Sequence, residues 1–81
     1  MTEAVYLPLT APVKRGTVLK KIRKEAQRAG VHLTVFEGAR HTRLDCGGTL
    51  TTIPRHTEIP DRLVEAIFKQ LEDPLGKGWW R

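Results

Sequence analysis

The chain has 81 residues, of which 40% are hydrophobic and 28% are charged. This length suits one domain with a modest core, and the composition excludes an intrinsically disordered chain. No apolar run approaches the roughly 18 residues that a membrane-spanning helix needs, and we expect neither a secretory signal nor membrane binding. The single cysteine, Cys46, cannot form an internal disulfide and favours a reducing compartment, so we expect a cytoplasmic protein.

Positive charge is concentrated in the first half of the chain. Residues 1–44 contain nine Lys or Arg and three Asp or Glu, whereas residues 45–81 contain five and six. A basic half indicates a polyanionic partner, most simply a nucleic acid. The alternative is that these charges only solvate the surface, and charge alone does not decide between the two.

The sequence divides into an N-terminal arm over residues 1–16, a domain over residues 17–73 and a C-terminal tail over residues 74–81. Prolines oppose a helix in the arm, which either extends over the domain or a partner or is a frayed terminus. The tail contains Trp79 and Trp80. It either folds back onto the domain or is an exposed anchor for a partner.

The first predicted element is an amphipathic helix over residues 18–29, with Thr17 as N-cap and Gly30 as C-cap. Its apolar stripe is expected to face the core, and its opposite face is basic. Spacing by four places three cations on one side of this helix: Lys20, Lys24 and Arg28. These cations either face the phosphates of a nucleic acid or form an ordinary exposed face, and the scarcity of acids in the helix favours phosphate binding.

Three strands are predicted after this helix, over residues 31–36, 41–46 and 49–53. Their side chains alternate between apolar and polar, so each strand is expected to turn one face to the core. Residues 38–40 form the first turn and Gly47-Gly48 the second, and such short turns make the sheet antiparallel. On this alternation, His41 and Arg43 lie on the face away from the core.

A second amphipathic helix is predicted after Pro60, which suits a first helical turn. Its apolar side chains recur with helical spacing from Leu63 to Leu71, and Pro74 is expected to end it. Two helices with apolar stripes must cover one sheet face. The predicted fold class is therefore α+β, a two-layer α-β-β-β-α domain with both helices on one face of an antiparallel three-stranded sheet.

Several features together resemble the HicA toxin family. They are the basic first helix, the Gly38-x-x-His41 turn, the Thr-Ile-Pro-Arg-His stretch over residues 52–56 and the amphipathic last helix. The resemblance covers roughly residues 17–72. It implies a double-stranded-RNA-binding-like fold and an mRNA-cleaving endoribonuclease of a bacterial toxin–antitoxin pair. It also implies that a HicB-like antitoxin is the protein partner.

The resemblance also assigns roles to the histidines. The family's single catalytic histidine follows a glycine in the turn before the second strand, which implies that His41 is the catalyst. The Pro-Arg-His stretch implies that His56 lies near the same surface, where a role as second proton carrier is the less favoured interpretation. The family's Gly-Ser-His turn is replaced here by glycine, Ala39, Arg40 and histidine, so the geometry of the turn is open.

A histidine near arginines suits RNA cleavage without a metal, and we expect neither a metal nor a cofactor. Histidine moves protons near neutral pH because its unperturbed pKa is roughly 6.5. The proposed RNA-binding arginines are Arg40, Arg43 and Arg55, because guanidinium groups bind phosphate oxygens. Pairing of Arg55 with Glu58 is equally favoured. On residue chemistry alone, His41 could instead be a turn histidine that caps a backbone group.

Other interpretations remain open at this point. Phe36, on the open face, either stacks on a nucleobase or packs at the edge of the core. The whole chain could be a non-catalytic RNA-binding module of the same fold, which would need the basic helix but no histidine. It could also be a protein-interaction adaptor that uses the arm and the tail. The sequence does not indicate which RNA sequence or structure is preferred, nor the oligomeric state.

Overall fold

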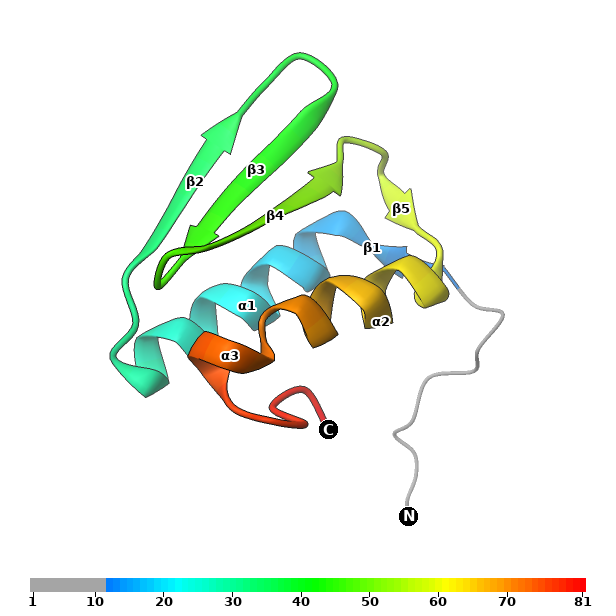
Figure 1. Ribbon diagram of the computed structural model, residues 1–81. Coiled ribbons are helices and arrows are strands. Elements are labelled where there is room, and N and C mark those ends of the chain that lie inside the picture. The colour runs from blue at the N-terminus through cyan, green and yellow to red at the C-terminus, as the bar shows by residue number, and fades with distance from the viewer. Residues whose placement is uncertain (1–11) are drawn as a thin grey trace.

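The computed structural model describes residues 12–81, and Figure 1 shows how their elements are arranged. The elements are strand β1 (Val13–Lys14), helix α1 (Arg15–Ala29), strands β2 (Leu33–Glu37), β3 (His41–Cys46), β4 (Thr49–Pro54) and β5 (Glu58–Ile59), and helices α2 (Asp61–Gln70) and α3 (Glu72–Leu75). Strands β2, β3 and β4 form an antiparallel sheet in that order. The predicted α+β class and three-stranded antiparallel sheet are therefore confirmed. Within residues 12–81, no helix is long and apolar enough to cross a membrane.

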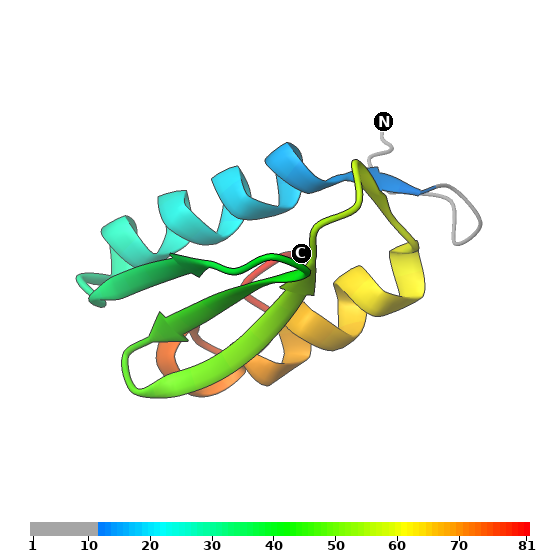
Figure 2. The ribbon, with the colours of Figure 1, turned by 90° about the horizontal axis from the view of Figure 1, so that it is seen from above.

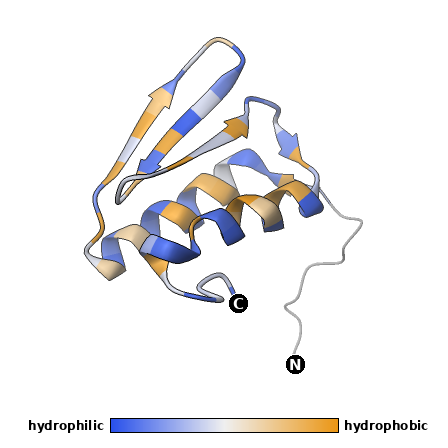
Figure 3. Ribbon diagram, in the orientation of Figure 1, coloured by the Kyte–Doolittle hydropathy of each residue, from blue (hydrophilic) through white to orange (hydrophobic). Residues whose placement is uncertain are grey.

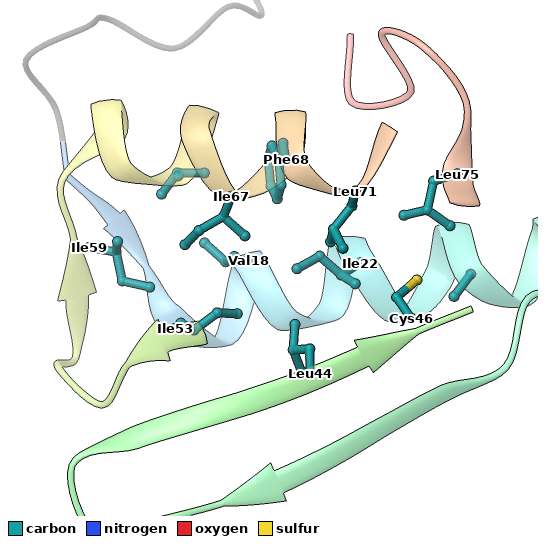
Figure 4. Packing of buried hydrophobic residues seen from close by; sticks show 12 residues of the cluster. Val18, Ile22, Leu44, Cys46, Ile53, Ile59, Ile67, Phe68, Leu71 and Leu75 are labelled. Atoms are coloured by element: carbon teal, nitrogen blue, oxygen red, sulfur yellow. The ribbon is translucent and has the colours of Figure 1, made fainter. Parts of the chain in front are cut away.

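The domain has two layers. Helices α1 and α2 both lie on one side of the three-stranded sheet, and the other sheet face is uncovered (Figures 1 and 2). The core between the layers contains side chains from α1, the sheet and α2, including Ile22, Leu44, Ile53 and Ile67 (Figure 4). Burying one such aliphatic side chain contributes roughly 1.5–3 kcal/mol. Figure 3 shows that apolar and polar residues alternate along these strands and helices.

The alternation along β3 places the candidate catalytic side chain on the open face. The inward residues Thr42, Leu44 and Cys46 are all 0% exposed. His41 and Arg43 point to the other face and are exposed. Residues 47 and 48 form the predicted second turn, and both glycines have the positive φ (60° and 92°) that a tight turn of this kind needs.

Helix α1 begins earlier than predicted. It starts at Arg15, so Thr17 lies in its first turn and is not the N-cap, and no side chain caps this end. The Arg15 backbone N–H instead donates to the Thr57 carbonyl oxygen (2.8 Å). The strand pairing between β1 and β5 brings these two groups together, so a distant segment replaces the expected hydroxyl cap. The predicted C-cap is confirmed, since Gly30 has a φ of 71°.

The second half of the chain also differs from the prediction in detail. The connector expected over residues 55–59 contains β5. Helix α2 ends at Gln70, and Pro74 lies inside the separate helix α3 instead of ending α2. A proline is tolerated there because the first turn of a helix does not use its N–H groups. Leu63, expected in the apolar stripe, is 37% exposed and lies outside the core.

The structure describes only part of the predicted N-terminal arm but all of the predicted C-terminal tail. Most of the predicted N-terminal arm falls on residues 1–11, outside the described residues, and its last part forms β1 and the start of α1. The C-terminal tail folds back onto the domain. The Trp79 indole N–H donates to the Phe68 carbonyl oxygen (2.8 Å), and the two rings meet edge-on with centroids 4.7 Å apart. The tail is therefore not an exposed tryptophan anchor.

Candidate functional site

The turn between β2 and β3 is closed by a backbone contact that requires glycine. The Gly38 N–H donates to the His41 carbonyl oxygen (2.8 Å), which leaves Ala39 and Arg40 at the tip. A Cβ atom on residue 38 would lie 2.9 Å from that oxygen. No non-glycine residue in the described chain has a positive φ, and neither does Gly38. The predicted turn is confirmed, and glycine is needed there for close approach rather than for a left-handed conformation.

His41 lies at the edge of this turn, on the open sheet face. It is the first residue of β3 and stands opposite Pro54 of β4. It lines a shallow hollow of about 380 Å³ whose other lining residues are Phe36, Glu37, Gly38, Ala39, Arg40 and Arg43. The imidazole accepts or donates no hydrogen bond within residues 12–81, so no backbone-capping role is seen there. An imidazole and two guanidinium groups thus share one hollow.

Phe36 extends this surface across the sheet. It is paired with Arg43 in the β2–β3 ladder, and 55% of it is exposed. It does not belong to the hydrophobic core cluster, so the core-packing interpretation of this residue is wrong. An exposed aromatic ring next to an exposed guanidinium is a surface on which a nucleobase can stack.

A polar cluster at the base of the turn fixes the strand ends that carry His41. Glu37, the last residue of β2, accepts a hydrogen bond from the Thr42 hydroxyl (2.7 Å) and one from the Arg15 guanidinium of α1 (3.0 Å). Arg15 also donates to the Thr42 hydroxyl. Thr42 is buried and directly follows His41. These contacts therefore restrain the backbone at the candidate catalytic residue.

The same contacts favour the ionised form of Glu37. The hydrogen bond from Thr42 lowers the pKa of the Glu37 carboxyl below its ordinary value, and Arg15 and Arg55 add to this effect. Desolvation opposes the shift without reversing it. The carboxylate is thus charged at neutral pH, where it holds both guanidinium groups.

Arg55 closes the cluster from the loop after β4. Its Nη1 donates to the Gly38 carbonyl oxygen (2.7 Å), and its Nε lies 3.8 Å from the Glu37 carboxylate. No ion pair joins it to Glu58 within the described residues, so the pairing that the sequence suggested is replaced by one with Glu37. About 44% of the Arg55 side chain is exposed. Arg55 therefore holds the hairpin and still presents a cationic edge to a ligand.

His56 lines a different hollow from His41. This second hollow, of about 510 Å³, lies at the start of α1 and is lined by Lys14, Arg15, Gly16, Thr17, Lys20, Arg55, His56 and Thr57. Arg55 is the link between the two sites, because it lines the second hollow and binds the hairpin that lines the first. The structure thus brings His56 close to the hairpin anchor but does not place it in the hollow of His41.

All three predicted cations belong to α1, but only Lys20 lines a hollow. Lys20 lines the second hollow, beside His56. Lys24 and Arg28 lie on later turns of the helix and line neither hollow. Arg28 is 3.7 Å from Glu25, which offsets part of its charge. All three side chains are exposed, but only Lys20 adjoins the residues that hold the hairpin.

The reasoning from sequence missed Arg15, Glu37 and Thr42 as the residues that organise the site. One signal was available. Thr42 has the same strand parity as Leu44 and Cys46, so the alternation places a hydroxyl on the buried face. Buried polar groups are almost always hydrogen-bonded, and a partner for Thr42 could therefore have been sought among charged residues elsewhere in the chain.

Cys46 does not contribute to this surface. Its side chain is fully buried in the core. Burial, and then the nearby Asp45 carboxylate, raise the pKa of the Cys46 thiol. The thiol is therefore kept protonated and inaccessible, as expected for a structural cysteine.

Comparisons with models of protein families, with curated proteins and with solved structures find no match to this chain. The likeness to HicA toxins therefore rests on the sequence motifs quoted above. The site itself is defined by the geometry of the hairpin, its anchor and the two hollows.

Proposed function

We propose that this protein is an endoribonuclease of the HicA toxin type, an mRNA interferase that needs no metal. His41 is its general acid or base. The observation that carries this proposal is the hollow that His41 shares with Arg40 and Arg43 on an uncovered sheet face. The likeness of the motifs to HicA toxins supports it. The proposed setting is the cytoplasm, with mRNA as substrate and a HicB-like antitoxin as the partner that covers this face.

The proposed reaction uses the RNA's own 2′-hydroxyl as nucleophile. His41 removes the hydroxyl proton, the oxygen attacks the adjacent phosphorus, and the bond to the 5′-oxygen breaks as that oxygen takes up a proton from water; His41 then returns its proton to the solvent. The products are a 2′,3′-cyclic phosphate and a 5′-hydroxyl. Arg40 and Arg43 bind the non-bridging oxygens, whose negative charge grows in the transition state. One proton-transfer group of this kind contributes about 10²–10⁴-fold to the rate.

The anchor of the hairpin supports this role. Catalysis by proton transfer depends on a group held in a fixed position relative to the reacting atoms. Glu37 and Arg15 hold Thr42, the residue after His41. Arg55 holds Gly38, whose N–H binds the His41 carbonyl oxygen, while the His41 ring is exposed. The ring is therefore accessible to RNA while its backbone is restrained.

A matched pair of histidine variants tests the proposal. Wild type, His41→Ala and His32→Ala are incubated with RNA and a metal chelator, and cleavage and RNA affinity are measured separately. His32 is also exposed but lines neither hollow. We expect His41→Ala to lose about 10²–10⁴-fold in cleavage rate and to keep its RNA affinity, while His32→Ala behaves as wild type. Cleavage by His41→Ala at the wild-type rate would show that His41 is not the catalyst.

The second candidate is a non-catalytic RNA-binding module. One observation favours it: within residues 12–81, no side chain or backbone group orients the His41 ring by a hydrogen bond. The same assay distinguishes it, because this module would bind RNA and leave it intact even as wild type. No RNA affinity at all would instead favour a protein-interaction adaptor.

A further inference from the structure

The hollow at the start of α1, called the α1 groove from this point, is lined by Lys14, Arg15, Gly16, Thr17, Lys20, Arg55, His56 and Thr57. We propose that the α1 groove binds a backbone phosphate of the RNA next to the phosphodiester held at His41. This inference rests on the proposed function, since it names a second contact of the same substrate. It also gives His56 a role as a phosphate ligand in place of a second proton carrier.

The charge of the groove is the first argument. Four of its eight lining residues are Lys or Arg, and none is Asp or Glu. They come from three segments of the chain: β1, α1 and the loop after β4. Bringing positively charged side chains together from separate segments raises the free energy of the fold, because like charges repel. A polyanion that bridges them removes this repulsion.

Nearby acids neutralise the groove only in part. Glu58 stands opposite Lys14 in the β1–β5 ladder, but it does not line the groove, and no ion pair joins the two within the described residues. Glu37 binds Arg15 and lies near Arg55, so it offsets charge on the hairpin side. Lys20 is exposed, and no carboxylate of residues 12–81 pairs with it. Lys20 is therefore placed to bind an external phosphate.

The dimensions of the groove suit a piece of a chain. Its volume of about 510 Å³ exceeds the roughly 380 Å³ of the hollow at His41. Both hollows are open to the surface. Figures 1 and 2 show that the β2–β3 hairpin and the start of α1, which line them, lie at the same end of the domain. Open basic grooves allow a polynucleotide to enter and leave along its length.

The connection between the two hollows through Arg55 is a further argument. Arg55 lines the α1 groove, and its guanidinium binds the carbonyl oxygen of Gly38, whose own N–H binds the backbone of His41. Arg55 thus connects the two hollows. A strand of RNA that lies with one phosphodiester at His41 would pass over Arg55 and bring a further phosphate to Lys20 and His56.

The salt dependence of RNA binding tests this site independently of cleavage. The probe is a short single-stranded RNA with 2′-O-methyl riboses, which lacks the nucleophile and cannot be cut. Log affinity falls as log salt concentration rises, and each phosphate contact that is lost makes this fall less steep by roughly 0.7 for single strands. We expect this loss for Lys20→Ala. The matched control is Lys69→Ala, an exposed lysine near the end of α2 that lines neither hollow, and it should keep the wild-type slope.

Cleavage kinetics separate the two roles of His56. With an unmodified RNA of the same length, His56→Ala should raise KM several-fold and leave kcat near the wild-type value, because a ground-state phosphate contact is lost. With a dinucleotide, which cannot reach the groove, the same variant should match wild type. A fall in kcat for both substrates would show instead that His56 moves a proton.

The outcomes distinguish this inference from the proposed function. If Lys20→Ala has the same salt slope as Lys69→Ala, the groove is not a phosphate site, even if wild type cuts RNA through His41. If Lys20→Ala shows the expected loss but unmodified RNA is never cut, the groove stands and the nuclease proposal fails. If wild type binds neither the methylated RNA nor the unmodified RNA, both fail.

Discussion

At the scale of single residues, His41 is held in position by a hydrogen bond to its backbone, and no hydrogen bond within residues 12–81 holds its ring. The Gly38 N–H holds the His41 carbonyl oxygen, and Arg55 holds the Gly38 carbonyl oxygen. Sequence reasoning placed His41 on the open face from strand alternation. It could not identify the role of Arg55, because the pairing of that residue with Glu37 depends on how the loop after β4 packs against the hairpin.

Replacement of Gly38 tests this coupling. In Gly38→Ala the new Cβ would meet the His41 carbonyl oxygen at 2.9 Å, so the turn must open. We expect a loss of about 1–3 kcal/mol in the free energy of unfolding, as for other forced close contacts, and a fall in RNA cleavage as His41 moves. Urea unfolding and cleavage assays measure the two effects.

Gly16→Ala is the control for that variant. Residue 16 is helical, and a Cβ atom added there would have no neighbour within 4 Å. Alanine there should be neutral or should stabilise by up to roughly 1 kcal/mol, because glycine is a poor helix former. Equal stabilities of Gly38→Ala and wild type would show that the turn adapts and that the contact with His41 is not restrictive.

At the scale of elements, α1 has two roles beyond covering the sheet. Its first residue, Arg15, anchors the β2–β3 hairpin, and its next turn contributes Lys20 to the α1 groove. The sequence predicted the basic face of this helix but placed its start at residue 18 instead of Arg15. The reason is that the pairing of β1 with β5 brings the Arg15 N–H to the Thr57 carbonyl oxygen at the start of the helix. These strands have two residues each, which is too short for a periodic pattern to predict them.

The C-terminal tail is an element whose role is structural. Trp79 packs against Phe68 and binds its carbonyl oxygen. Trp79→Ala should lower the free energy of unfolding by about 2–3 kcal/mol, below the roughly 3–5 kcal/mol of a fully buried tryptophan, because Trp79 is partly exposed. Cleavage per folded molecule should not change.

Trp80→Ala provides the comparison within the same tail. The ring centroids of Trp80 and Phe68 are 6.1 Å apart, and the two rings are tilted relative to each other. The Trp80 indole makes no hydrogen bond within the described residues. We therefore expect a smaller loss of stability than for Trp79→Ala, measured by the same chemical unfolding. A larger effect at Trp80 would contradict the assignment of Trp79 as the main contact of the tail.

At the scale of the whole molecule, the layer arrangement was predictable because it depends on patterns that are local in the sequence. Alternation in β3, the glycine pair at 47 and 48 and the apolar stripe of α2 each specify a face or a turn. The hairpin anchor was not predictable in the same way. It joins Arg15, Glu37 and Arg55, which are far apart in the chain and meet only once the layers have packed.

The stability that this anchor gives the domain at neutral pH should be lost at acid pH. The pKa of Glu37 is lower in the folded chain than in the unfolded chain. Its stabilising contribution is therefore fully present above the unfolded value of about 4.3 and is lost as the pH falls through the folded value. Glu37→Gln should be less stable than wild type at neutral pH, and the difference should shrink below about pH 4.

Urea unfolding at a series of pH values measures this difference. Glu65→Gln is the control, because its carboxylate belongs to α2 and takes no part in the anchor. We expect it to keep the wild-type dependence on pH in this range. A constant difference between Glu37→Gln and wild type at every pH would show that the charge of Glu37 does not stabilise the fold.

The central claim is that His41 cuts RNA through the RNA's own 2′-hydroxyl, and its most direct test changes the substrate rather than the protein. Two RNAs are compared in a metal chelator, one all-ribose and one with a single 2′-deoxyribose on the 5′ side of a mapped cut. Wild type should cut the first at that position to leave a 2′,3′-cyclic phosphate, and it should not cut the second there. His41→Ala should cut neither at the wild-type rate. Cleavage of the second RNA at the deoxy position, at the rate of the first, would contradict this mechanism.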